Sequence, residues 1–590
     1  LTTLTIIADC LASIKMREGV EIDWSSVSLN DAETMQLFSD GRTDAIFQFE
    51  SSGMQEICRR LKPKELEDLS ALNALYRPGP IDGGMIEEFI KRHRGEKEIE
   101  YIVPEMKDIL ENTFGVLVYQ EQIMQLAQKL AGYSLGDADL MRRAMGKKKP
   151  EEMAPHEKKF IDGAVARGIE KKTAKEIFDL MAKFADYGFN RSHSIAYAYL
   201  AFQTGYLKAH YPAHFYASVL SHEADDSAKV YKYSSELKLL GLELLPPDVN
   251  ESDEGFTPTG NAVRYGLNAI KGMGSTSSHA IIEARKSGRF SSIFDFASRI
   301  DQGAINRRGL ESLISAGAFD SINTNGASIG LWRARLFASI NDALSHAQNI
   351  WNDRISGQTG LFGGAANQQT EFELPIVDAW SEAEVSAKEK SAVGFYLTSH
   401  PLDAYVETLK SFGIRNLADR GEFRVGSNIV IAGIITSSNV AWSKKGDRFC
   451  KFRLEDRSMG VECLVWSEAF NKHSGNIIDD AAIIVEGKVK VAEGSDVTIV
   501  VNEIRPLEDQ IAKSARSVSI SLPSNAVEGR FLDDLFGMLS ESPGRTDVFL
   551  EMTVDGVRTK LHAPALSVQG SSVFRRNLEA KGCKVNWSLQ

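Results

Sequence analysis

The sequence predicts a multidomain protein that is mostly α-helical in its first part and mainly β in its last part. Three observations lead to this prediction. The chain has 590 residues, enough for about three to five domains. Apolar side chains recur at helical spacing through residues 1–245, and Pro246-Pro247 then breaks the pattern. Residues 428–505 instead hold five β-rich runs separated by turns or short loops.

Composition is that of an ordinary globular protein, with 43% hydrophobic and 25% charged residues. No two cysteines have metal-ligand spacing, so neither zinc nor disulfides are expected. The five are Cys10, Cys58, Cys450, Cys463 and Cys583. The net charge of −12 argues against a uniformly basic nucleic-acid surface but allows local basic channels.

The N-terminus suggests both a location and a truncation. It has no basic-then-apolar targeting signal, and no long apolar run occurs anywhere, so we expect a cytoplasmic protein. The first residues, LTTLTIIADC, lack an initiator Met and lie within a predicted helix. We therefore expect that the chain is truncated at this end.

The first run that suggests chemistry extends over residues 119–149. A helix over 122–130 is closed by Gly132, and a second helix begins near Asp137 and stops at Gly146, before Lys147-Lys148-Lys149. Arg142 and Arg143 on this second helix project about 100° apart, so they can converge on a multivalent anion such as a polyphosphate. The alternative is a solvated basic face.

Asp137 and Asp139 in the same run could be paired carboxylates for Mg²⁺. Both open a helix, where the helix dipole favours acidic side chains in any case. We interpret them as structural residues.

The second run follows a helical segment that breaks at Tyr187-Gly188. It presents Asn190, Arg191, Ser192 and His193 before an apolar helix that begins at Ile195. Amide, guanidinium, hydroxyl and imidazole groups at a helix start suit phosphate or base contact. The alternative is an ordinary helix start.

A glycine-rich turn follows a short predicted strand over residues 263–267. In the run AIKGMGSTSSHAIIEAR, Lys271, Gly272 and Gly274 precede a helix. This pattern predicts a helix-hairpin-helix element, whose backbone N–H groups approach a DNA phosphate without regard to sequence. The alternative is a simple tight turn.

The five β-rich runs predict an OB-fold barrel, with a helical insert near Glu468. They are NIVIAGIIT, RFCKFRLED, GVECLVWS, AAIIVEGKV and DVTIVVNEI. Aromatic and cationic residues in or beside the first long loop fit single-stranded nucleic acid. They are Trp442, Lys444, Lys445, Arg448, Phe449 and Lys451. The alternative places Phe449 and Trp466 in the barrel core.

Several long strings occur in the order found in one family. They are RPGP (77–80), YQEQ (119–122), DLMRRAMGKKKPEEM (139–153), YGFNRSHSIAYA (187–198) and LKAHYPAHF (207–215). Together they resemble the fingers region of the alpha subunit of bacterial DNA polymerase III, the C-family replicative polymerase. The likeness continues, more weakly, to the C-terminus.

The resemblance implies roles for the residues of both runs. Arg142 and Arg143 would hold the incoming dNTP, and Ser192 and His193 would line the same pocket. Asn190 and Arg191 would serve either the nucleotide or the primer-template DNA. DNA contacts are also expected at Lys271, Gly272, Gly274, Lys444, Lys445 and Arg448.

The resemblance also implies partners for the second half of the chain. Gln358, Leu361 and Phe362, within QTGLF, resemble the short peptide by which polymerases dock on the sliding clamp. The last region would contact the tau subunit of the clamp loader within the replicase holoenzyme.

In this family the metal-binding aspartates lie in the palm, upstream of the string that matches Leu1 onward. We therefore expect Mg²⁺ to arrive with the palm and the dNTP, and this chain to be inactive alone. The alternative is a non-catalytic DNA-binding and clamp-tethering module. An error-prone paralogue within the family is a second alternative.

Four domains are predicted: mostly helical fingers (1–245), a helix-hairpin-helix and clamp-binding region (246–425), an OB fold (426–508) and a small α/β domain (509–590).

Overall fold

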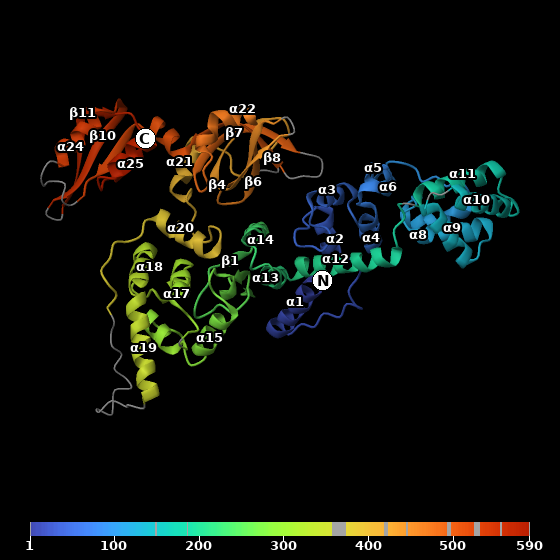
Figure 1. Cartoon of the computed structure of the whole chain (residues 1–590), viewed down its shortest axis with the longest axis horizontal. Helices are drawn as coiled ribbons and strands as arrows, with labels where there is room; N and C mark the ends of the chain where they lie inside the picture. The colour runs from blue at the N-terminus through green and yellow to red at the C-terminus, as the bar shows by residue number, and fades with distance from the viewer. Residues whose placement is uncertain are drawn as a thin grey trace. The chain divides into compact units, whose positions relative to one another are not determined.

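The computed structural model describes residues 2–147, 150–185, 187–301, 303–356, 373–417, 423–443, 446–491, 497–523, 531–554 and 557–588. Within it the chain forms two compact units. The first comprises Leu1–Trp380 and Lys388–Phe395, and the second comprises Ser381–Ala387 and Tyr396–Gln590. Figure 1 shows the elements of both units, labelled in chain order.

The first part of unit 1 is helical, as predicted. Its α-helices are α1 (Thr2–Glu18), α2 (Ala32–Ser39), α3 (Ser52–Leu61), α4 (Leu66–Leu75), α5 (Pro78–Asp82), α6 (Met85–His93), α7 (Lys107–Leu110), α8 (Gln120–Ala131), α9 (Leu135–Lys147), α10 (Pro150–Val165), α11 (Lys171–Phe184), α12 (Arg191–His210), α13 (Pro212–His222) and α14 (Ser227–Leu239). Two 3₁₀ turns, η1 (Pro104–Met106) and η2 (Glu111–Thr113), precede α8.

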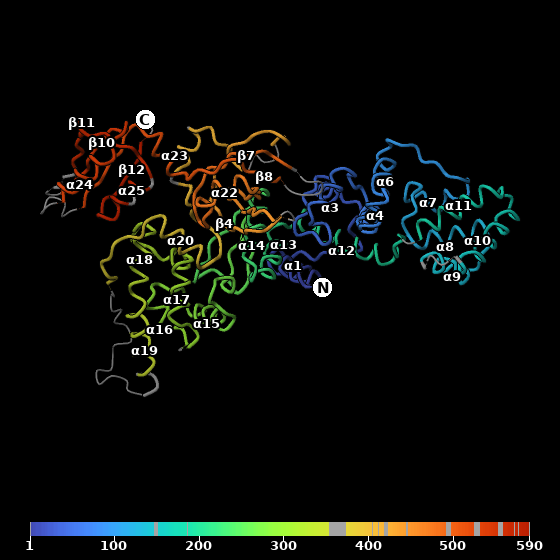
Figure 2. The backbone as a smooth tube through the Cα atoms, turned by 45° about the horizontal axis from the view of Figure 1, so that its top comes forward, coloured from blue at the N-terminus to red at the C-terminus, as the bar shows by residue number. Residues whose placement is uncertain are grey.

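Two apolar cores organise these helices. One joins α2 to α6 with α12 and contains Phe38, Leu72 and Phe202. The other joins α8 to α11 and contains Leu126 and Phe178. The long helix α12 packs against α2 and α4, as Figure 1 shows, and it lies beside α4 again in Figure 2. The segment just before α12 pairs with the residue just before α8.

The buried Lys208 of α12 holds the loop before α3 in place. Its Nζ donates to the carbonyl oxygens of Arg42 (2.8 Å) and Asp44 (3.0 Å) and to the Glu236 carboxylate (2.9 Å). Burial lowers the pKa of Lys208, although the negative charge of Glu236 opposes that shift. One ammonium group thus satisfies two loop carbonyls and ties α12 to α14.

The second part of unit 1 combines short helices with a small sheet. Its helices are α15 (Ser275–Arg285), α16 (Ile293–Arg299), α17 (Arg307–Ser315), α18 (Ile329–Ala338), α19 (Ile340–Ser356) and the 3₁₀ turns η3 (Leu267–Ala269) and η4 (Asp320–Ile322). The strands β1 (Glu243–Leu245), β2 (Thr257–Pro258) and β3 (Ala262–Arg264) have the order β1-β3-β2. α20 (Glu382–Val393) contributes residues to both units.

Unit 2 contains the predicted five-stranded barrel. Strands β4 (Asn428–Trp442), β5 (Arg448–Glu455), β6 (Gly460–Val465), β7 (Ala482–Val491) and β8 (Val497–Pro506) close in the order β4-β5-β6-β8-β7. Before the barrel come η5 (Asp403–Tyr405) and α21 (Val406–Ser411), and between β6 and β7 come α22 (Ser467–His473) and η7 (Ser474–Asn476). The helical insert therefore follows β6, as predicted.

The alternative that placed two aromatic residues in the barrel core is wrong for Trp466. Its side chain is 47% exposed, and Phe449, only partly buried, packs against it with ring centroids 5.5 Å apart. The barrel core instead contains aliphatic residues, Met459, two cysteines (Cys450 and Cys463) and the phenylalanines Phe423, Phe452 and Phe470. Phe449 faces outward because side chains alternate between the two faces of β5 and its neighbour Cys450 is buried, and Trp466 lies just after β6, where α22 begins.

The last region of unit 2 is a small α/β domain, as predicted. Its helices are α23 (Leu507–Ser514), α24 (Phe531–Ser540) and α25 (Ser572–Glu579). Strands β9 (Ser517–Ser521), β10 (Pro543–Val554), β11 (Val557–Val568) and β12 (Lys584–Ser588) form one sheet in the order β11-β10-β9-β12. In the ranges described for both units, no helix has the length and apolar character needed to cross a membrane.

We predict that Lys208→Met lowers the free energy of unfolding by about 3–5 kcal/mol, because the Glu236 carboxylate and two carbonyls lose their buried partner. Urea denaturation followed by circular dichroism measures this. Lys229→Met is the control, since its ion pair with Glu223 lies at the surface with the lysine side chain 47% exposed and should contribute less than about 1 kcal/mol. Equal losses from both substitutions would contradict the structural role of Lys208.

Candidate functional site

Backbone pairing joins the two runs that the sequence analysis singled out. Tyr119 and Phe189 form a parallel β-bridge. The Gln120 N–H donates to the Phe189 carbonyl (2.9 Å), and the Phe189 N–H donates to the Val118 carbonyl (3.1 Å). The residues just before α8 and just before α12 therefore lie side by side, although about 70 residues of chain separate them.

The buried side chain of Gln122 fixes the turn that leads into α8. Its Oε1 accepts hydrogen bonds from the backbone N–H groups of Val118 (2.9 Å) and Tyr119 (3.0 Å). Its Nε2 donates to the Thr113 hydroxyl (2.8 Å). One amide thus satisfies two N–H groups that precede the helix, which is the capping role of glutamine near a helix start.

Arg77 of the RPGP string contacts the segment 187–189, which forms the backbone pairing with Tyr119. Its Nη2 donates to the Tyr187 carbonyl (2.7 Å), and its guanidinium lies 4.6 Å from the centre of the Phe189 ring. Burial lowers the pKa of Arg77. The short helix α5 begins at Pro78 of this string, where the missing N–H costs no hydrogen bond.

Arg142 and Arg143 share one carboxylate. Asp139 Oδ1 accepts from Arg142 Nε (3.2 Å) and Nη2 (2.9 Å), and Asp139 Oδ2 lies 2.8 Å from Arg143 Nη2. The Arg142 side chain is 21% exposed and that of Arg143 is 64% exposed. The hydrogen bond from Arg142 holds the pKa of Asp139 below its ordinary value, so the carboxylate stays ionised at neutral pH. An incoming anion must compete with it.

Asp137, the other carboxylate in this run, pairs with Lys159 of α10 (3.0 Å). Among the residues with described positions, no group of three or more His, Cys, Asp or Glu side chains could hold a metal ion.

The second run caps α12 with its own side chains. Asn190 Oδ1 accepts from the His193 N–H (2.8 Å), and the Glu121 carboxylate accepts from Asn190 Nδ2 (3.1 Å) and from the Arg191 N–H (3.0 Å). The N–H groups of Arg191 and His193 are thus already used. The side chains of Arg191, Ser192 and His193 are exposed, so they are the groups available to a phosphate here.

An aromatic column connects this helix start to a loop that the sequence analysis did not assign to the site. The ring centroid of His193 lies 5.6 Å from that of Phe189 and 4.3 Å from that of Tyr197. Tyr197 in turn lies 5.2 Å from Phe47. Phe47 lies in the string AIFQFESSGM (45–54), whose local pattern does not indicate a contact with a residue 150 positions later in the chain.

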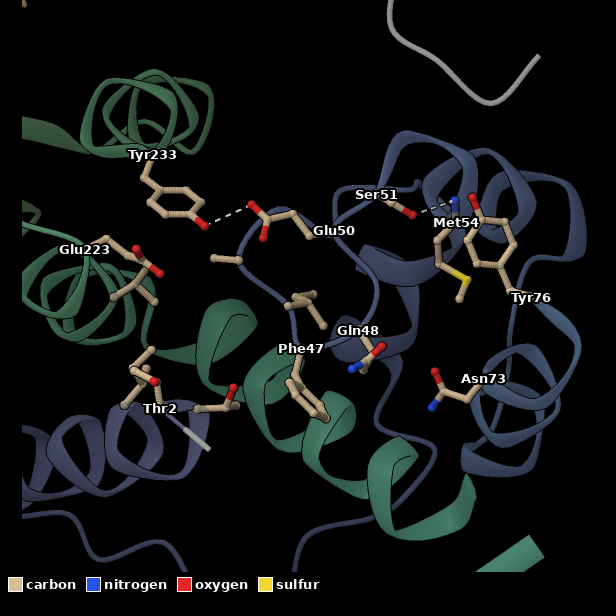
Figure 3. Close-up of a pocket in the computed structure, with 15 residues that line it drawn as sticks. Thr2, Phe47, Gln48, Glu50, Ser51, Met54, Asn73, Tyr76, Glu223 and Tyr233 are labelled. Atoms are coloured by element: carbon tan, nitrogen blue, oxygen red, sulfur yellow. Dashed lines mark hydrogen bonds between the residues drawn. The ribbon is translucent and has the colours of Figure 1, made fainter. Parts of the chain in front are cut away.

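A cavity of about 450 Å³ lies beside Phe47. Figure 3 shows Phe47, Gln48 and Asn73 around the same space, with Glu50 accepting a hydrogen bond from Tyr233 (2.9 Å) at another side. Ala45 and Gln48 have positive φ angles of 62° and 65°. Residues other than glycine rarely adopt this backbone conformation. Contacts with the surrounding structure, including the hydrogen bonds from Lys208, therefore stabilise the loop.

The predicted hairpin turn presents an exposed backbone. Gly272 has φ +86°, a conformation that favours glycine, and Gly274 is the residue that caps α15. Lys271 and both glycines are exposed. The geometry allows a phosphate to approach the turn.

Some of the residues predicted to bind single-stranded nucleic acid lie on the surface of the barrel. The Arg448 guanidinium lies 5.8 Å from the Trp442 ring centre and 5.4 Å from that of Phe470, and Trp442 is 69% exposed. Lys451 pairs with Glu462 at 3.4 Å. Lys444, Lys445 and the clamp residues Gln358, Leu361 and Phe362 lie outside the described residues.

Comparison with known families identifies three regions. Residues 3–168 match the bacterial DNA polymerase III alpha subunit finger domain, residues 241–329 a helix-hairpin-helix motif, and residues 429–507 an OB-fold nucleic acid binding domain. These regions carry, respectively, the arginine pair, the glycine turn and the closed barrel.

Curated relatives are similar over nearly the whole chain. DNA polymerase III subunit alpha of Pasteurella multocida is 39% identical over 92% of this chain, that of Escherichia coli K12 is 39% identical over 91%, and that of Neisseria meningitidis Z2491 is 37% identical over 100%. The alignments cover 48%, 47% and 51% of those proteins, so the chain spans about half the length of the relatives it matches.

We predict that Asp139→Asn strengthens binding of inorganic tripolyphosphate about two- to fivefold at low salt, because a competing charge is removed while a hydrogen-bond acceptor for Arg142 remains. Isothermal titration calorimetry measures the affinity. Asp137→Asn, on the same helix but paired with Lys159, should leave it unchanged. Weaker binding by Asp139→Asn would show that the carboxylate orients the arginines rather than competing for them.

Proposed function

We propose that this chain, which is similar to bacterial DNA polymerase III alpha subunits over nearly all of its length, supplies the part of a replicative polymerase that binds the incoming dNTP and the primer-template DNA. It would act in template-directed DNA synthesis in the cytoplasm. The observation that carries the proposal is the convergence of RPGP, YQEQ, Arg142 and the start of α12 on one backbone pairing. These strings are the ones that carry the family resemblance.

The arginine pair suits a triphosphate. Two guanidinium groups fixed beside each other match the several negative oxygens of a polyphosphate, and they neutralise charge that grows as the phosphoryl bond breaks. The Ser192 hydroxyl and the His193 imidazole are exposed at the start of α12 and would add contacts to the same ligand. Mg²⁺ would reach this site with the nucleotide.

DNA contacts follow the exposed cations and glycines. Asn190 and Arg191 would meet the primer-template near the nucleotide. Lys271, Gly272 and Gly274 would hold a duplex phosphate, which requires no particular base sequence. In the barrel, Lys444, Lys445 and Arg448 would follow a single strand, and Trp442 beside Arg448 offers an exposed ring for base stacking.

Partners and domains complete the proposal. Gln358, Leu361 and Phe362 would dock on the sliding clamp, and the C-terminal domain would contact the clamp-loader tau subunit of the replicase. The working domains would be 1–245, 246–425, 426–508 and 509–590. In this division, the first domain would bind the nucleotide and the second would attach the chain to the sliding clamp.

We expect the double substitution Arg142→Glu and Arg143→Glu to weaken dATP binding by the 590-residue chain at least about tenfold, because charge-assisted hydrogen bonds become repulsions. Calorimetry with dATP, and DNA binding followed across salt concentration, measure both functions. Lys171→Glu with Lys172→Glu is the control, a pair of adjacent exposed cations on α11. Unchanged dATP affinity in the arginine variant would refute the nucleotide assignment.

We expect Leu361→Ala with Phe362→Ala to abolish binding to a bacterial sliding clamp, because an apolar pocket would lose both anchoring side chains. DNA affinity should not change. Surface plasmon resonance on immobilised clamp measures this, and Gln368→Ala with Gln369→Ala controls for general effects of substitution in the same part of the sequence. Full clamp affinity without Leu361 and Phe362 would exclude QTGLF as the docking peptide.

A further inference from the structure

The side chain of Gln120 contacts both parts of the candidate site: Arg142 on α9 and the segment just before α12. Its Oε1 accepts a hydrogen bond from Arg142 Nη1 (3.1 Å), and its Nε2 donates to the Gly188 carbonyl (2.9 Å). Its backbone N–H donates to Phe189 (2.9 Å). A single residue therefore contacts α9 on one side and the segment before α12 on the other.

These contacts require the chemistry of glutamine. An amide can accept from a guanidinium and donate to a carbonyl at the same time, whereas a carboxylate can only accept. Gly188 packs closely enough that a Cβ atom there would lie 3.1 Å from Gln120 Cγ and 3.5 Å from its Cα. The space for the amide is therefore fixed by the opposing turn.

Arg142 is held from two directions. Asp139 accepts from its Nε and Nη2, and Gln120 accepts from its Nη1, so these bonds use three of its five N–H groups. The other two make no further hydrogen bond within the described residues. A guanidinium fixed by two partners presents its remaining donors in one orientation, which lowers the entropy lost when an anion binds.

We propose that Gln120 is a positioning residue that sets the direction of the Arg142 guanidinium relative to the start of α12, so that Arg142 and His193 act on the same triphosphate. This inference rests on the proposed function and deepens it. Without Gln120, Arg142 would retain Asp139 but lose its link to the segment that carries His193. The two groups would then bind an anion independently.

The test is a double-mutant cycle on the 590-residue chain, with dATP and inorganic tripolyphosphate as probes. Arg142→Ala and His193→Ala are measured singly and together, with Gln120 present and in Gln120→Ala. We expect Gln120→Ala to weaken binding about tenfold, and the coupling between Arg142 and His193 to disappear. Gln125→Ala, an exposed glutamine on the same helix, is the control and should change neither quantity.

Two further variants keep the test decisive if Gln120→Ala does not fold. Gln120→Glu retains an acceptor for Arg142 but cannot donate to Gly188, and its charge opposes the anion, so it should bind more weakly than Gln120→Ala. Gly188→Ala should displace the amide without changing Gln120 and should also remove the coupling.

The outcomes separate the two proposals. If Arg142→Ala weakens binding but the coupling with His193 persists in Gln120→Ala and Gly188→Ala, Gln120 does not position Arg142 and the nucleotide assignment stands. If Arg142→Ala has no effect on either probe, the nucleotide assignment fails and this inference fails with it. Loss of coupling together with unchanged melting temperature supports the positioning role.

Discussion

The candidate site depends on one short backbone pairing, the parallel bridge between Tyr119 and Phe189. It brings the starts of α8 and α12 together, and several side-chain contacts between distant parts of the chain lie around it. Arg77 packs its guanidinium on Phe189, Gln120 spans to Gly188, and Glu121 reaches Asn190 and the Arg191 N–H. Two main-chain hydrogen bonds thus place three sequence-distant strings around one region, at a cost in loop-closure entropy that the two surrounding apolar cores offset.

Each cationic part of the candidate site is paired with a carboxylate of the same chain. The chain carries a net charge of −12, yet Arg142 and Arg143 face one carboxylate, and the α12 start faces another. Under the proposed function, binding of a polyanion would therefore be an exchange between an internal partner and an external one, and the affinity would reflect the difference between them. Such an exchange would favour a ligand with several closely spaced charges over a single carboxylate or chloride, because one small anion would not contact both arginines and the α12 side chains.

The remaining candidate surfaces are simpler. The hairpin turn offers backbone and one lysine, and the barrel offers an exposed Trp442 beside Arg448. Within the described residues, neither surface has a counterpart of the Gln120 amide, which bridges α9 and the segment before α12. That difference agrees with their expected ligands, because DNA phosphates and stacked bases are bound without close discrimination, whereas a reacting triphosphate must be held in one orientation.

The sequence by itself determined the features that depend on local periodicity. The 3.6-residue pattern identified the helical region, the alternation over 428–505 identified the barrel, and Arg142 and Arg143 were recognised on a predicted helix. Tertiary structure decided what those residues touch. Gln120 lies 22 residues from Arg142 and 68 from Gly188, and Phe47 is 150 residues from Tyr197. Local patterns cannot specify such pairs, because they arise only when separate apolar cores fix the distances between helices.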